Sequence, residues 1–134
     1  MPPSEHRADD PDAWIAMARE DLALAEAKPA GVSYRPLCFH AQQAAEKATK
    51  AVLIAKSVLF PYIHDIGRLL ELARSSGLDV PHELKDADLL TDYVSVARYP
   101  GFTEIIQSDY EMALALARRV LQWAEAVPNE HTGG

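Results

Sequence analysis

The fold is decided by one stretch of the chain, which reads Cys38-Phe-His-Ala-Gln-Gln-Ala-Ala-Glu-Lys-Ala48. Through it and beyond it, small and apolar residues recur at alternating spacings of three and four, at Cys38, Ala41, Ala45, Ala48, Val52, Ala55 and Leu59. This spacing is typical of a helix with one buried face. Because most of these positions are alanine, a neighbouring helix can approach closely. We therefore predict a long helix over about residues 35–57 that packs in a bundle.

The rest of the chain has the same helical periodicity, and no alternating run between turn residues indicates a strand. Further helices are expected at residues 11–27 behind a cap at Asp10, between Asp65 and Gly77, from Pro81 to Tyr99, and at residues 104–127. The prediction is an all-α, up-and-down bundle of four to five helices. It occupies residues 10–127, with a flexible arm at residues 1–9 and a disordered tail at residues 128–134.

The composition is that of an ordinary globular protein, since 49% of the residues are hydrophobic and 25% are charged. No stretch approaches the roughly 20 uncharged apolar residues that a membrane helix needs. The first residues lack the apolar core of a secretory leader. The one cysteine, Cys38, excludes an intramolecular disulfide and a zinc site of four cysteines. We therefore expect a soluble protein of the reducing cytoplasm.

The formal net charge of −7 argues against a general nucleic-acid coat, because neutralising phosphates requires a basic surface. The charge is unevenly distributed, however, since residues 34–77 carry +3 and the remainder of the chain carries −10. Two interpretations stay open. The central segment could hold a nucleotide, an RNA or an acidic partner, or its charges could be a scatter of solvated side chains.

A second set of residues follows the helical period on the other side of the long predicted helix. These polar side chains form a ridge at His40, Gln43, Lys47 and Lys50. Glu46 lies four residues before Lys50 and can pair with it. The ridge offers several hydrogen-bond donors to an anion, but it is equally consistent with a solvated face.

Two further pairs of residues lie at predicted helix ends. His64 and Asp65 stand where a helix begins, so they could bind phosphate, or Asp65 could simply cap the helix. Arg98 and Tyr99 stand where a helix ends, where a cation complements the helix dipole. The chain has no glycine-rich phosphate loop, no dinucleotide fingerprint and no His-Glu-x-x-His motif. We expect no cofactor and no metal.

The motifs that carry a family resemblance are Ala18-Arg-Glu-Asp-Leu22, Phe39-His-Ala-Gln-Gln-Ala-Ala-Glu-Lys47, Lys50-Ala-Val-Leu53, His64-Asp65, Tyr93 and Ala97-Arg-Tyr-Pro100. Together with the alanine-rich last helix, they resemble the HEPN domain (higher eukaryotes and prokaryotes nucleotide-binding domain) over about residues 12–127. The resemblance implies a helical bundle that commonly forms a homodimer. Bacterial members are often encoded beside a minimal nucleotidyltransferase, and some of these pairs behave as toxin and antitoxin.

The resemblance also bears on catalysis. Members that cut RNA carry an arginine followed, after four to six residues, by a histidine. Here no histidine follows Arg98 until His131, and the similar spacing of Arg35 and His40 lies in the wrong helix. Without that histidine, a base for the ribose 2′-hydroxyl is missing.

The sequence therefore predicts a non-catalytic module that binds a nucleotide, an RNA or a partner protein. The residues proposed to bind a ligand are His40, Gln43, Lys47, Lys50, His64, Asp65, Arg98 and Tyr99. Two alternatives remain, a metal-independent endoribonuclease toxin and a purely structural dimerisation module.

Overall fold

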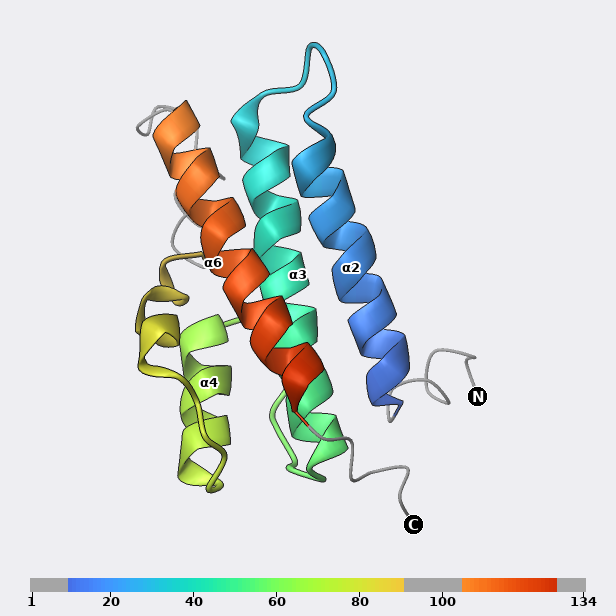
Figure 1. Cartoon of the computed structure of the whole chain (residues 1–134), viewed down its shortest axis with the longest axis vertical. Helices are drawn as coiled ribbons and strands as arrows, with labels where there is room; N and C mark the ends of the chain where they lie inside the picture. Colours follow the sequence, from blue (N-terminus) through green and yellow to red (C-terminus); the bar gives the residue numbers. More distant parts are fainter. Residues whose placement is uncertain (1–9, 91–104, 128–134) are drawn as a thin grey trace.

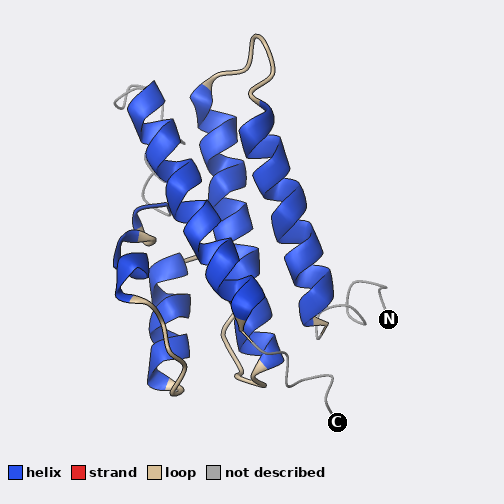
Figure 2. Cartoon of the chain, in the orientation of Figure 1, coloured by secondary structure: helices blue, strands red, loops and turns tan. Residues whose placement is uncertain are grey.

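The computed structural model describes residues 10–90 and 105–127, and the regular secondary structure of this part is helical. Its elements are α2 (Pro11–Ala27), α3 (Tyr34–Ala55), α4 (Ile66–Ser75), the 3₁₀ helix η1 (His82–Asp86) and α6 (Gln107–Ala126) (Figure 1). Figure 2 shows only helices and loops among these residues. The predicted all-helical bundle is confirmed. The expected arm and tail, and residues 91–104 with Arg98 and Tyr99, lie outside the described residues.

Two helix starts follow directly from the capping residues in the sequence. The carboxylate of Asp10 accepts the backbone N–H of Asp12 at 3.0 Å, at the first turn of α2. The carboxylate of Asp65 accepts the backbone N–H of Arg68 at 3.1 Å, at the first turn of α4. A side-chain oxygen at this position satisfies an amide that the helix itself cannot. Both predicted caps are confirmed.

Helix α3 is the central element of the bundle. It packs against α2, α6 and α4. Helix α2 runs in the opposite direction to α3, whereas α3 and α6 begin at the same end of the molecule (Figure 1). Because neighbours surround α3, almost all of its side chains after the first turn are at least partly buried.

Alanine lines the contacts between the three long helices. The fully buried alanines that these helices contribute to the main hydrophobic core are Ala18 and Ala25 of α2, Ala41, Ala45 and Ala48 of α3, and Ala113 and Ala117 of α6. Side chains this small let helix axes come close together. The predicted alanine stripe of α3 is therefore the core of the bundle, and we call these seven residues the alanine seam.

The prediction fails at the end of this stripe, because Leu59 is 94% exposed. Helix α3 ends at Ala55, before the predicted end, and the backbone N–H of Val58 then bonds to the carbonyl of Leu53 at 2.8 Å. This turn breaks the helical phase that would have buried Leu59. The segment after it packs Val58, Phe60 and Ile63 against a second small core, and it leaves Leu59 and Tyr62 outside.

The helix predicted from Pro81 also differs in its first turns, which are 3₁₀ rather than α-helical. The buried side chains are Leu84, Ala87 and Leu90, which recur every three residues. Backbone bonds of the same spacing join Leu84 to Pro81, Ala87 to Leu84 and Leu90 to Ala87. A period of three matches the 3₁₀ helix, in which residues three apart share one side.

The segment that carries these bonds, residues 81–90, is called here the 3₁₀ segment, and it approaches α4 closely at Gly67. A β-carbon placed on Gly67 would lie 2.7 Å from the β-carbon of Asp88, which is too close for any real pair of carbon atoms. The absence of a side chain at Gly67 thus allows the two elements to touch.

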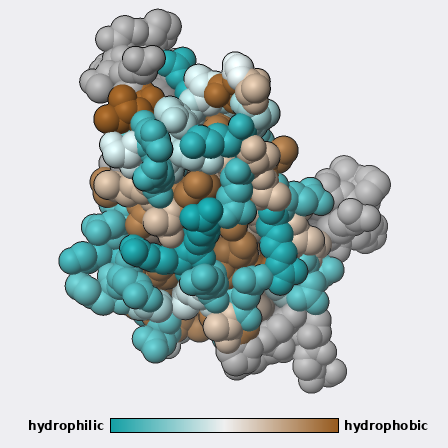
Figure 3. Space-filling model, turned by 45° about the horizontal axis from the view of Figure 1, so that its top comes forward, coloured by the Kyte–Doolittle hydropathy of each residue, from teal (hydrophilic) through white to brown (hydrophobic). Residues whose placement is uncertain are grey.

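Figure 3 shows one face of the molecule, with hydrophilic side chains and apolar atoms visible between them.

Candidate functional site

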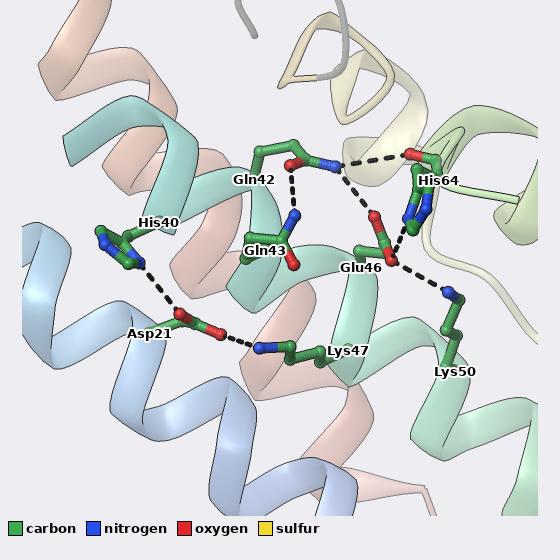
Figure 4. Close-up of polar contacts among 8 residues, drawn as sticks. All are labelled: Asp21, His40, Gln42, Gln43, Glu46, Lys47, Lys50 and His64. Carbon is green, nitrogen blue, oxygen red and sulfur yellow. Dashed lines mark hydrogen bonds and ion pairs between the residues drawn. The ribbon is translucent and has the colours of Figure 1, made fainter. Parts of the chain in front are cut away.

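The buried carboxylate of Glu46 is the centre of the polar site (Figure 4). One of its oxygens, Oε1, accepts a hydrogen bond from Gln42 Nε2 at 3.0 Å. The other, Oε2, lies 2.9 Å from Lys50 Nζ and 2.9 Å from His64 Nδ1. Since Glu46 is only 3% exposed, these three partners take the place of the water that its carboxylate would otherwise meet.

Lys50 is buried together with Glu46, and it too is 3% exposed. Its ammonium nitrogen lies 5.8 Å from the ring centre of Trp14, 5.9 Å from that of Phe60 and 5.6 Å from that of Tyr62. Aromatic faces attract a cation at such distances. The predicted pairing of Glu46 with Lys50 is confirmed. Of the two interpretations of the ridge, the solvated face is wrong at Lys50, because α3 is covered on this side as well.

A second carboxylate organises the other predicted residues of the ridge. Asp21 of α2 lies 3.0 Å from His40 Nδ1 through Oδ1 and 2.5 Å from Lys47 Nζ through Oδ2. Asp21 itself is buried, and both partners belong to α3. The contacts join α2 to α3 and neutralise Lys47. Thus the two lysines of the ridge are both ion-paired within the protein.

The remaining predicted residues take different roles. Gln43 donates to the side-chain oxygen of Gln42 at 3.2 Å, which continues the network around Glu46. Asp65 caps α4, as described above. The side chain of His64 is 59% exposed, and its ring contacts that of Tyr62 edge to face at 5.4 Å between centres. The structure thus brings His64, Gln43 and Lys50 together around Glu46 and places His40 and Lys47 around Asp21.

The imidazole ring of His64 is held on one side by Glu46 and is exposed on the other. Because Nδ1 of His64 faces the carboxylate of Glu46, its outer nitrogen Nε2 is the one that can meet a ligand. The ring of Tyr62 beside it is 89% exposed. An exposed aromatic ring next to a positioned hydrogen-bonding group can hold a planar, polar molecule.

Sequence reasoning missed Asp21 and Tyr62. Asp21 lies between Ala18 and Ala25 at spacings of three and four, on the buried stripe of the first helix. A carboxylate on an apolar stripe is the signal that could have revealed it, because such a group must be paired. Tyr62 gave no comparable signal, since its exposure depends on how the segment after α3 turns.

Other chemistry finds little support in the described part of the chain. No group of three or more histidine, cysteine or carboxylate side chains there is arranged to hold a metal. Burial raises the pKa of the Cys38 thiol to about 11, and the charge of Asp109 adds to the shift. A thiol of this kind is protonated and unreactive at neutral pH. None of the helices described is long and apolar enough to cross a membrane.

Comparisons with known proteins agree with this architecture. The family model described as the HEPN domain matches residues 11–127. The crystal structure of TT1696 from Thermus thermophilus is 31% identical, covers 89% of this chain and 96% of its own, and superposes with a TM-score of 0.72. The crystal structure of ST0689, an archaeal HEPN homologue, is 26% identical, covers 86% of this chain and 94% of its own, and gives a TM-score of 0.67.

No curated protein matches the chain significantly. The family model alone spans most of the sequence, and the two crystal structures share its helical bundle over nearly their whole length. The chain therefore belongs to the HEPN domain family, a family of nucleotide-binding and ribonuclease-type modules.

Proposed function

We propose that this protein is a non-catalytic HEPN module that binds a nucleotide or a single-stranded RNA through Tyr62 and His64. The observation that carries the proposal is the edge-to-face contact of these two exposed rings, together with the anchoring of His64 by the buried carboxylate of Glu46. A nucleobase can stack on Tyr62, a contact that contributes about 1–3 kcal/mol in other proteins. The outer nitrogen of His64 can then hydrogen-bond to the base, the ribose or a phosphate.

The buried residues around this pair supply rigidity rather than contact. Lys50 holds the charge of Glu46, and Glu46 in turn holds the ring of His64, before any ligand arrives. A group that is already positioned loses less conformational entropy on binding. In this proposal Lys47 and Lys50 support the site, and they do not neutralise phosphates. Contacts from His40, Gln43, Arg98 and Tyr99 stay predictions.

The binding proposal is tested by titration calorimetry of the full chain with ATP, GTP and a short single-stranded RNA. We expect Tyr62→Ala and His64→Ala each to weaken binding about tenfold, from the loss of one stacking or hydrogen-bonding contact. Leu59→Ala is the matched control for Tyr62, because Leu59 is similarly exposed on the same segment. His82→Ala is the control for His64, because His82 is an exposed histidine on another element. An absence of heat, or equal loss in variants and controls, would contradict the proposal.

The proposal also includes partners, which the family resemblance supports. We propose a homodimer that acts with a minimal nucleotidyltransferase, in the manner of toxin-antitoxin pairs. Met17 and Leu24 are exposed apolar residues four before and three after Asp21 on α2, and Phe39 is another on α3, beside His40; we propose that a second copy of the chain covers them. Light scattering should give a mass of two chains for the unchanged protein and a mass of one chain for Phe39→Asp. A nucleotidyltransferase encoded beside this chain should co-purify with it.

One observation favours the ribonuclease alternative. A histidine whose inner nitrogen meets a carboxylate, while its outer nitrogen is accessible, has the arrangement of a general base. If the protein were an endoribonuclease, expression without a partner would arrest growth, and Arg98→Ala or His64→Ala would relieve the arrest. Normal growth with intact cellular RNA would exclude this second function.

A further inference from the structure

A cleft of about 370 Å³ lies between α4 and the 3₁₀ segment that follows it. Its floor is apolar, formed by the buried side chains of Leu70 and Leu84. Its walls are charged, and they comprise Asp65, Arg68, Glu71, Arg74, Lys85 and Asp88. The volume falls in the range of sites that hold small molecules or parts of them.

The charges of this cleft are not all engaged within it. Asp65 accepts the backbone N–H of Arg68 and is engaged as the cap of α4. Glu71 and Arg74 form an ion pair at 2.7 Å. Among the described residues, the side chains of Arg68 and Lys85 form no ion pair, and Asp88 is the one wall carboxylate without a hydrogen bond or an ion pair. Two cationic groups of the cleft therefore remain available, and an anion can pair with them.

The residues that line the cleft begin directly after the Tyr62–His64 pair in the chain. Asp65, on its rim, follows His64 directly in the chain, and Arg68 belongs to the first turn of α4. Neighbouring α-carbons are about 3.8 Å apart, so the backbone of His64 lies next to that of the lining residue Asp65. Gly67 contributes by its lack of a side chain, because the resulting contact with Asp88 brings the far wall close to α4.

We propose that this cleft is a second phosphate subsite, in which Arg68 and Lys85 hold a phosphate group of a ligand whose base lies on Tyr62. The inference rests on the proposed function, and it adds that the ligand carries more than one phosphate. That second phosphate could belong to the polyphosphate tail of a nucleotide or to the next phosphodiester of a single strand. Both sources present the same chemistry to an arginine and a lysine.

The subsite is tested by comparing three ligands at one fixed ionic strength. AMP carries one phosphate, ATP carries a polyphosphate tail, and a short single-stranded RNA carries successive phosphodiesters. In the double variant Arg68→Ala/Lys85→Ala we expect about tenfold weaker binding of ATP, of RNA or of both, with AMP changed less than about twofold. Arg19→Ala/Arg118→Ala is the matched control, because it removes the same net charge from exposed residues on α2 and α6.

The outcomes separate the two proposals. Loss of ATP binding alone identifies a polyphosphate ligand, and loss of RNA binding alone identifies a strand; either result supports the subsite. If AMP weakens as much as ATP and RNA, or if the control loses as much as the double variant, the subsite is refuted while the Tyr62–His64 site stands. If the unchanged protein binds none of the three ligands, the proposed function itself fails.

Discussion

Replacing Glu46 by glutamine should severely destabilise the folded protein. Glu46 and Lys50 each have only 4% of their side chains exposed, so the substitution would leave the ammonium of Lys50 inside the protein without its counter-charge. Removing one partner of a buried ion pair typically destabilises a protein by about 3–5 kcal/mol. The substitution would also remove the charge that holds His64. Because small domains have about 5–15 kcal/mol of stability in total, this one change should bring the protein close to unfolding.

Replacing both partners should have the opposite effect. Lys50→Met alone should cost about 1–3 kcal/mol, since Glu46 keeps Gln42 and His64 as partners. Glu46→Gln/Lys50→Met should recover most of the loss, because no uncompensated charge remains and the replacements have similar volumes. The two single effects should therefore be non-additive by about 2 kcal/mol or more.

Urea denaturation followed by far-UV circular dichroism measures these free energies of unfolding. The control is Glu71→Gln, which removes a carboxylate of similar kind from an exposed ion pair with Arg74. Such exposed pairs contribute at most about 1 kcal/mol. A loss of stability in Glu46→Gln no larger than that of this control would refute the predicted cost of the unpaired lysine. Simple addition of the Glu46→Gln and Lys50→Met losses in the double variant would refute it too.

Three further predictions concern other parts of the molecule. Alanine normally favours a helix over glycine, but Gly67→Ala should lower the free energy of unfolding by about 1–3 kcal/mol, because the new β-carbon would meet Asp88. Adding Asp88→Gly should restore the lost stability, as measured by urea denaturation. Tyr110→Phe should destabilise by about 1–2 kcal/mol, measured in the same way, because the carbonyl of Ala25 would lose its 2.5 Å hydrogen bond. Alkylation of Cys38 should be slow at neutral pH and should accelerate up to about pH 11, because burial raises the pKa of this thiol. The same shift stabilises the folded state below pH 9.0, and this stability should be lost as the pH rises from 9.0 towards about 11.

The helices could be predicted because their signals are local. Asp10 and Asp65 cap the helices that follow them, and the alanines of α3 repeat at the helical period. Each signal lies within a few residues of the structure it specifies. The position of Leu59 could not be predicted in this way, because the turn at Val58 depends on the packing of residues from α3 and α4.

The candidate site was predictable only in part. The sequence indicated His64 because it stands at the start of a helix. It also indicated the pairing of Glu46 with Lys50, because these residues are four positions apart on one helix. It could not show that Lys50 is buried, since helical periodicity describes one covered face and α3 is covered on several sides. Nor could it pair Lys47 with Asp21, because these residues are 26 positions apart and meet through tertiary packing.

The alanine seam constrains how the sequence of this protein can change over evolutionary time. A larger side chain at any seam position would overpack the contact, which costs about 1–3 kcal/mol. Glycine, the one smaller residue, would weaken the helix by about 1 kcal/mol. Substitution is thus unfavourable in both directions at these positions, whereas the exposed residues of the site face no such restriction. Homologous chains should therefore keep the seam while they diversify the surface that meets a ligand.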